Sequence, residues 1–230
     1  SHSNVKALYY DPAKEIIWIG THLGGLNKLD IRTGTFTHYL MEEGNPETLP
    51  SNIVRDIAPY QDQLIVATQN GVCLFNPQTG KCQQLFKDSK EGRKIAMVAD
   101  VEVDNSGTLW IAATGEGIFS YRFDTNKLTN YRHDGTQAHS LSNNNVNNIM
   151  QDSKGNLWFS TSGSGLDLYR SATNDFENFD KGKNGLVSDC IYDTQESPVS
   201  GKLILITNQG FSIFDQKVEK FQNYSVENGF

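Results

Sequence analysis

Short apolar segments separated by turn residues follow one another along the whole chain, and they recur in one repeated phrase. Its clearest copies run Asp152-Ser-Lys-Gly-Asn-Leu-Trp158-Phe-Ser-Thr161 and Asp104-Asn-Ser-Gly-Thr-Leu-Trp110-Ile-Ala-Ala113. The small residue that ends the phrase recurs at steps of 45 to 48 residues, at Thr21, Thr68, Ala113, Thr161 and Thr207. A regular period of this length is typical of repeat architectures. The chain therefore contains five copies of one structural unit.

Each repeat carries four strand signals, which are clearest in the fourth copy at 146–151, 157–161, 166–169 and 176–179. Between the first two, Asp152-Ser-Lys-Gly155 is a turn sequence in which Gly supplies a positive φ. No segment shows the i, i+3, i+4, i+7 apolar spacing of an amphipathic helix over a useful length. The pattern predicts about 20 strands in five antiparallel four-stranded sheets, with almost no helix.

Strand residues are apolar on both faces, as in Ile204-Leu-Ile206, which is typical of sheets that are covered on both sides. We therefore predict an all-β fold, a β-propeller of four-stranded antiparallel blades with one repeat per blade and the first strand innermost. Residues 1–230 would form a single propeller segment, which either closes as five blades or is an arc of a larger ring. The expected blades cover residues 3–50, 51–96, 97–141, 142–186 and 187–230.

Charge and cysteine usage narrow the class of protein. The 230 residues carry a formal net charge of −7, which argues against contact with a polyanion such as nucleic acid. The three cysteines, Cys73, Cys82 and Cys190, form no CxxC pair and no zinc spacing with histidine. Cys82 falls where the other copies carry Phe or Leu, so we expect it to be a small buried apolar side chain.

Several segments resemble the two-component regulator propeller repeat, and the resemblance runs through the whole chain. They are Leu49-Pro-Ser-Asn-Ile-Val-Arg-Asp-Ile57, Leu141-Ser-Asn-Asn-Asn-Val-Asn-Asn-Ile149, the phrase at 152–161 and the tail Phe221-Gln-Asn-Tyr-Ser-Val-Glu-Asn-Gly-Phe230. The resemblance implies the periplasmic sensor region of a Bacteroides-type hybrid histidine kinase and response regulator. In that family, seven-bladed propellers precede a β-sandwich, a membrane helix and the kinase. It further implies an oligosaccharide ligand, control of polysaccharide utilisation, the rest of the sensor kinase chain as a partner, and a homodimer.

Two other functions stay open at this stage, a free-standing lectin-like or protein-interaction propeller and a propeller glycosidase or lyase. The sequence has no GxSxG, P-loop or HxxxH motif, so we expect no catalytic residue, cofactor or metal in this segment. Asp104 and Asp152 open turns that look like calcium loops but lack the further acidic ligands, and we expect them to cap their own turns. The tryptophans could stack on sugars, but their equivalent positions favour packing between blades.

The candidate ligand groups come from the first strand of each repeat. Aligned copies place Lys6, Arg55, Ala99, Asn147 and Tyr192 at one position, and Ala7, Asp56, Asp100, Asn148 and Asp193 at the next. Because side chains alternate along a strand, we expect the first set to face the channel or its mouth, and the second to bond neighbouring backbone and hold blades together. Asn52 and His22 would lie on the same rim. Cationic, amide and aromatic groups suit an acidic or neutral sugar, whereas the alternative is a water-filled polar channel.

Overall fold

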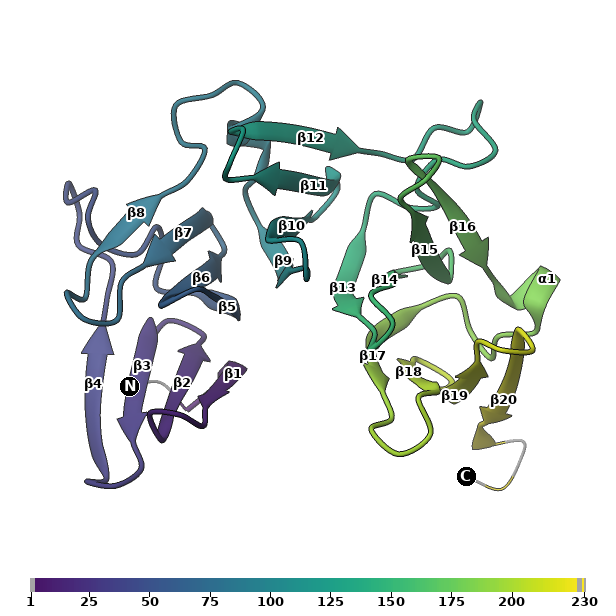
Figure 1. Ribbon diagram of the computed structural model, residues 1–230, viewed down its shortest axis with the longest axis horizontal. Coiled ribbons are helices and arrows are strands. Elements are labelled where there is room, and N and C mark those ends of the chain that lie inside the picture. Colours follow the sequence, from purple (N-terminus) through teal and green to yellow (C-terminus); the bar gives the residue numbers. More distant parts are fainter. Residues whose placement is uncertain (1–2, 227–228, 230) are drawn as a thin grey trace. The chain divides into compact units, whose positions relative to one another are not determined.

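A computed structural model describes residues 3–226 and 229 of the chain. In this part of the chain, twenty short strands join in sequence order into five antiparallel four-stranded sheets (Figure 1). The two helices among these residues are one 3-10 turn, Gly92–Lys94, and the four-residue α1, Lys181–Asn184. The predicted all-β fold of propeller blades is confirmed. Each sheet lies inside one of the residue ranges expected for a blade.

The strands of the five sheets have the following bounds. The first sheet contains β1 (Val5–Asp11), β2 (Ile16–Thr21), β3 (Leu26–Asp30) and β4 (Thr35–Tyr39), and the second β5 (Val54–Tyr60), β6 (Gln63–Thr68), β7 (Gly71–Phe75) and β8 (Cys82–Gln84). The third contains β9 (Val98–Val103), β10 (Thr108–Ala113), β11 (Gly117–Arg122) and β12 (Lys127–Tyr131). The fourth contains β13 (Val146–Gln151), β14 (Leu157–Thr161), β15 (Leu166–Arg170) and β16 (Asp175–Phe179), and the fifth β17 (Ile191–Glu196), β18 (Leu203–Thr207), β19 (Gly210–Asp215) and β20 (Lys220–Tyr224).

The chain divides into two compact units, residues 1–103 and 104–230. The first unit contains the first two sheets and β9. The second contains β10 to β12 and the last two sheets.

The turn that joins the first two strands of a repeat is held by its aspartate. The Asp152 Oδ1 atom accepts hydrogen bonds from the backbone N–H groups of Lys154 (3.0 Å) and Asn156 (2.9 Å), and its Oδ2 accepts one from Trp158 Nε1 at 3.0 Å. Asp104 makes the equivalent bond to Trp110 Nε1 at 2.8 Å. The expectation that these aspartates cap their own turns is confirmed. Each carboxylate also fixes the indole that follows it.

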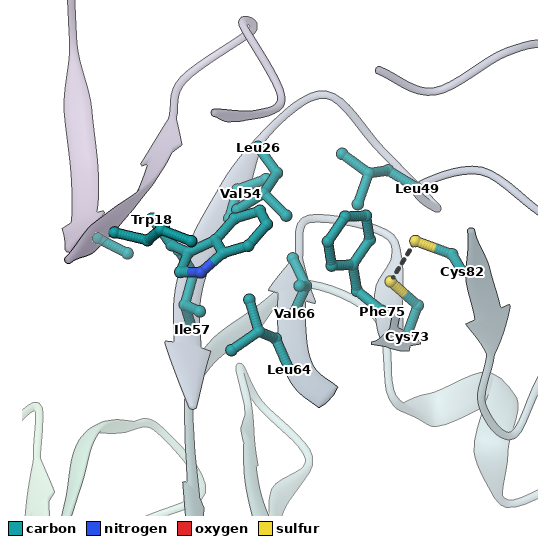
Figure 2. Close-up of a cluster of buried hydrophobic side chains, with 12 residues drawn as sticks. Trp18, Leu26, Leu49, Val54, Ile57, Leu64, Val66, Cys73, Phe75 and Cys82 are labelled. Carbon is teal, nitrogen blue, oxygen red and sulfur yellow. Dashed lines mark hydrogen bonds between the residues drawn. The ribbon is translucent and has the colours of Figure 1, made fainter. Parts of the chain in front are cut away.

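The three tryptophans are buried, and each packs on an aromatic ring of the following sheet. Trp18, Trp110 and Trp158 are at most 3% exposed. Trp18 and Phe75 belong to the buried cluster in Figure 2, and their ring centroids are 5.4 Å apart. The ring centroids of Trp158 and Phe214 are 5.8 Å apart. The expected role of these rings in packing between sheets is confirmed, and they form the core that fixes one sheet on the next.

The cysteines of the second sheet lie in the same core. Cys73 and Cys82 are buried on β7 and β8, with their sulfur atoms 3.0 Å apart (Figure 2). Burial, with the neighbouring Cys82 thiol adding to it, raises the pKa of the Cys73 thiol. Cys82 is thus the small buried side chain that its alignment with Phe and Leu predicts.

Candidate functional site

The first strand of four sheets carries a β-bulge close to its start. The register shifts between Val54 and Asp56 in β5, and in the same way in β1, β13 and β17. The residue inside each shift is Lys6, Arg55, Asn147 and Tyr192. A bulge removes one residue from the ladder and re-aims its side chain, and bulges are enriched beside functional sites. The set predicted from the alignment is therefore the set of bulge residues.

The bulge corrects one step of the sequence argument. Strict alternation would place Arg55 and Asp56 on opposite sides of the sheet, one of them in the core. Instead Val54 and Ile57 are buried and both residues between them are half-buried. The assumption of simple alternation was wrong here, because the extra residue lets both neighbours leave the core.

The position after the bulge ties one sheet to the next. Asp56 Oδ2 accepts a hydrogen bond from the backbone N–H of Val101 in β9 at 3.1 Å. Asn148 Oδ1 accepts the equivalent bond from the N–H of Thr194 in β17, also at 3.1 Å. The predicted role in holding neighbouring blades together is confirmed for these two residues.

The four bulge residues differ in how free their side chains are. Lys6 and Tyr192 are exposed, and Arg55 is half-buried. Asn147 uses both ends of its amide, since Nδ2 donates to the Ile191 carbonyl at 2.7 Å and Oδ1 accepts from Ser162 Oγ at 2.8 Å. Asn147 therefore acts as a further tie between the fourth and fifth sheets. In the first unit β1 lies beside β5, so Lys6 and Arg55 come from neighbouring strands.

The two candidate rim residues, Asn52 and His22, form hydrogen bonds with backbone groups. Asn52 Oδ1 accepts from the N–H of Met41 at 2.7 Å, and the Asn52 carbonyl accepts from the N–H of Gly25 at 2.9 Å. Asn144 repeats both bonds in the second unit, which shows that this asparagine closes a loop shared by the repeats. His22 is half-buried, and its backbone N–H donates to the Asn4 carbonyl at 2.9 Å.

A cleft of about 480 Å³ opens between the third and fourth sheets of the second unit, and the sequence analysis missed it. Its lining includes Trp110, Ser120, Tyr131 and Tyr169. In the third sheet, Ser120 lies opposite Trp110 on the neighbouring strand. At the equivalent position of the fourth sheet, Leu168 lies opposite Trp158. Leu168 packs on the core of its sheet, and a serine at this place is too small to do so. Comparing the repeats at this one position is the signal that could have found the cleft.

Aromatic, hydroxyl and charged groups meet in this cleft. The hydroxyls of Tyr131 and Tyr169 both donate to Asn174 Oδ1, at 2.8 and 2.7 Å. Burial, with the adjoining Tyr131 hydroxyl adding to it, raises the pKa of Tyr169, so the phenol stays a neutral donor. Lys127 and Arg122 also line the cleft, and both residues are exposed. The arrangement can hold a flat or ring-shaped polar ligand by ring contact and hydrogen bonds.

Neither a cluster of metal ligands nor a membrane-spanning helix occurs in the part of the chain that the structure describes. Among residues 3–226 and 229, no group of three or more His, Cys, Asp or Glu side chains could hold a metal ion. The same part of the chain has no helix whose length and apolar character would let it cross a membrane.

Two family profiles match the chain. The profile of the SMP-30/gluconolactonase/LRE-like region matches residues 7–140, which is more than half of the chain. The profile of the two component regulator propeller matches residues 140–163, which hold the fourth copy of the repeated phrase. No curated protein matches the chain.

Solved structures resemble the chain in fold. One is described as the extracellular domain of a hybrid two component system from B. thetaiotaomicron, with a TM-score of 0.82 and 24% identity over 96% of this chain and 28% of that one. PorZ of Porphyromonas gingivalis, a surface component of the type-IX secretion system, has a TM-score of 0.70 and 18% identity over 91% of this chain and 32% of that one. Virginiamycin B lyase of Staphylococcus aureus has a TM-score of 0.68 and 13% identity over 96% of this chain and 70% of that one. The chain thus spans less than a third of the first two proteins, and the likeness shows the fold.

Proposed function

The chain belongs to the SMP-30/gluconolactonase/LRE-like region family, and from its regulator propeller repeat at residues 140–163 we propose that it is a ligand-sensing segment of a hybrid two-component sensor kinase. That repeat is the observation that carries the proposal. The likeness to the extracellular domain of a hybrid two component system, over 96% of this chain, supports it.

The proposed segment lies in the periplasm and binds fragments of a glycan whose utilisation the system controls. The bulge groups Lys6 and Arg55 of the first unit supply cations, and the exposed Tyr192 of the second unit supplies a phenol; groups of both kinds suit sugar hydroxyls and carboxylates. Binding that differs between two arrangements of a homodimer would shift their populations and reach the kinase across the membrane.

The test uses the full natural chain in membranes, with autophosphorylation measured against a panel of oligosaccharides. A glycan-dependent change that Arg55→Ala weakens is the expected result. Glycan binding without any change in phosphorylation would favour a lectin-like propeller instead.

A second candidate is an enzyme, which the family match over residues 7–140 and the likeness to a lyase favour. The discriminating measurement is mass spectrometry of small lactones and of quinupristin incubated with the purified chain. Catalytic turnover of either compound would replace the sensor proposal.

A further inference from the structure

We propose that the cleft between the third and fourth sheets is a binding site for an acidic oligosaccharide that shares no residue with the strand-one bulges. It is lined by strand and turn residues of the second unit only, and by none of Lys6, Arg55, Asn147 or Tyr192. The choice of a sugar as the ligand class rests on the proposed function. The site itself rests on the geometry of the cleft.

The size and walls of the cleft fit one or two sugar rings. A volume of about 480 Å³ is within the range of small-molecule pockets. Tyr131 and Tyr169 stand 5.8 Å apart in an edge-to-face arrangement, and Trp110 lies 4.9 Å from Tyr169. Trp110 is buried beneath them, so the half-buried rings of the two tyrosines can pack against the C–H groups of a sugar, while the hydroxyls of Ser120 and Thr129 can bond to its hydroxyls.

The charges at the cleft select an acidic ligand. The lining contains one carboxylate, Asp104, and its oxygens already accept bonds from the Ser106 N–H, the Ser106 hydroxyl, the Thr108 N–H and the Trp110 indole. Lys127 adds a positive charge to the lining.

Arg122 is a second cation of the lining, bound to Asp124 in an ion pair whose side chains are both more than half exposed. Exposed pairs of this kind are weak, so the guanidinium can exchange Asp124 for a carboxylate of the ligand. The side chains that line the cleft thus carry two positive charges and one negative charge, in a chain whose net charge is −7.

The experiment is calorimetric titration of the 230-residue chain with trigalacturonate, with maltotriose as the neutral probe of the same length. Ser120→Leu copies the Leu168 of the next repeat and fills the cleft. We expect it to weaken trigalacturonate binding at least roughly tenfold with no loss of melting temperature. Lys127→Gln should weaken binding roughly three- to tenfold and reduce its salt dependence. Lys154→Gln, an exposed lysine that does not line the cleft, is the matched control and should change nothing.

Three results would overturn the inference. They are no saturable binding of trigalacturonate up to about 10 mM, equal affinity for maltotriose, or affinity unchanged by both Ser120→Leu and Lys127→Gln. If Ser120→Leu fails to fold, the exposed Lys127→Gln carries the test alone. A kinase that ignores every glycan would refute the proposed function even if the cleft binds, so the two failures are distinguishable.

Discussion

Replacing Asp152 by alanine should destabilise the second unit more than its exposed turn would suggest. The Asp152 side chain is 2% exposed and accepts five hydrogen bonds. When the carboxylate is lost, the donors of the exposed turn can form hydrogen bonds to water instead, so each of these lost bonds lowers the free energy of unfolding by about 1 kcal/mol or less. The indole N–H of Trp158 cannot, because that residue is 3% exposed, and an unsatisfied buried donor costs about 1–3 kcal/mol. We expect a total loss of about 3–4 kcal/mol.

Asp104 is the matched control within the same unit. It holds Trp110 as Asp152 holds Trp158, and both indoles are buried, but Asp104 is half-buried whereas Asp152 is 2% exposed, so water takes the place of the lost Asp104 carboxylate more readily. Asp104→Ala should therefore cost about 2 kcal/mol, less than the Asp152 variant.

Urea unfolding followed by circular dichroism measures both free energies of unfolding. A double-mutant cycle of Asp152→Ala with Trp158→Phe isolates the carboxylate–indole bond, and we expect a coupling of about 1–3 kcal/mol. A loss below about 0.5 kcal/mol for Asp152→Ala, or a coupling near zero, would refute the view that this turn anchors the inter-sheet core.

Three further predictions follow from single contacts. Burial raises the pKa of Asp167 to about 6, so the folded state holds this proton more tightly than the unfolded chain does. The free energy of unfolding should therefore fall by up to about 3 kcal/mol as the pH rises from about 4 to 6. Asp167→Asn should flatten this dependence, which urea unfolding at a series of pH values measures. Asp56→Ala breaks the bond to β9 and should lower the melting temperature by about 2–4 °C, whereas Arg55→Ala should shift it by less than about 1 °C; equal shifts in calorimetry would contradict the division of roles at the bulge. Cys190, which is half-buried, should react with Ellman's reagent in the native protein, while buried Cys73 reacts only after unfolding, since its thiolate is disfavoured.

The repeat period and its turn chemistry determine most of the fold that could be predicted. The phrase at 152–161 places a turn, a strand and a buried Trp158 in order, and each of these is local information. Its recurrence then predicts the stacking, because a sheet with two apolar faces needs a neighbour on each side.

The candidate site was harder to predict because it depends on register and on comparison between repeats. A bulge is visible in the sequence only as a spacing of three between buried residues, such as Val54 and Ile57, where alternation expects two. The roles of Asn52 and Asn147 were missed for another reason. Their amides are bound to backbone groups that folding brings close, and no local pattern marks those partners.

The pairing of a bulge residue with a tie residue explains how this fold can vary its chemistry without losing its packing. The residue after the bulge accepts from the N–H of the next first strand where it is Asp56 or Asn148, whereas the first repeat carries Ala7 there. The bulge residue is not paired in the strand ladder, so substitution of its side chain does not disturb the pairing. It is Lys6, Arg55 and Tyr192 in three repeats. Asn147 is the bulge residue of the fourth sheet, and its side chain bonds to the Ile191 carbonyl of the fifth sheet, so a bulge residue can also hold two sheets together.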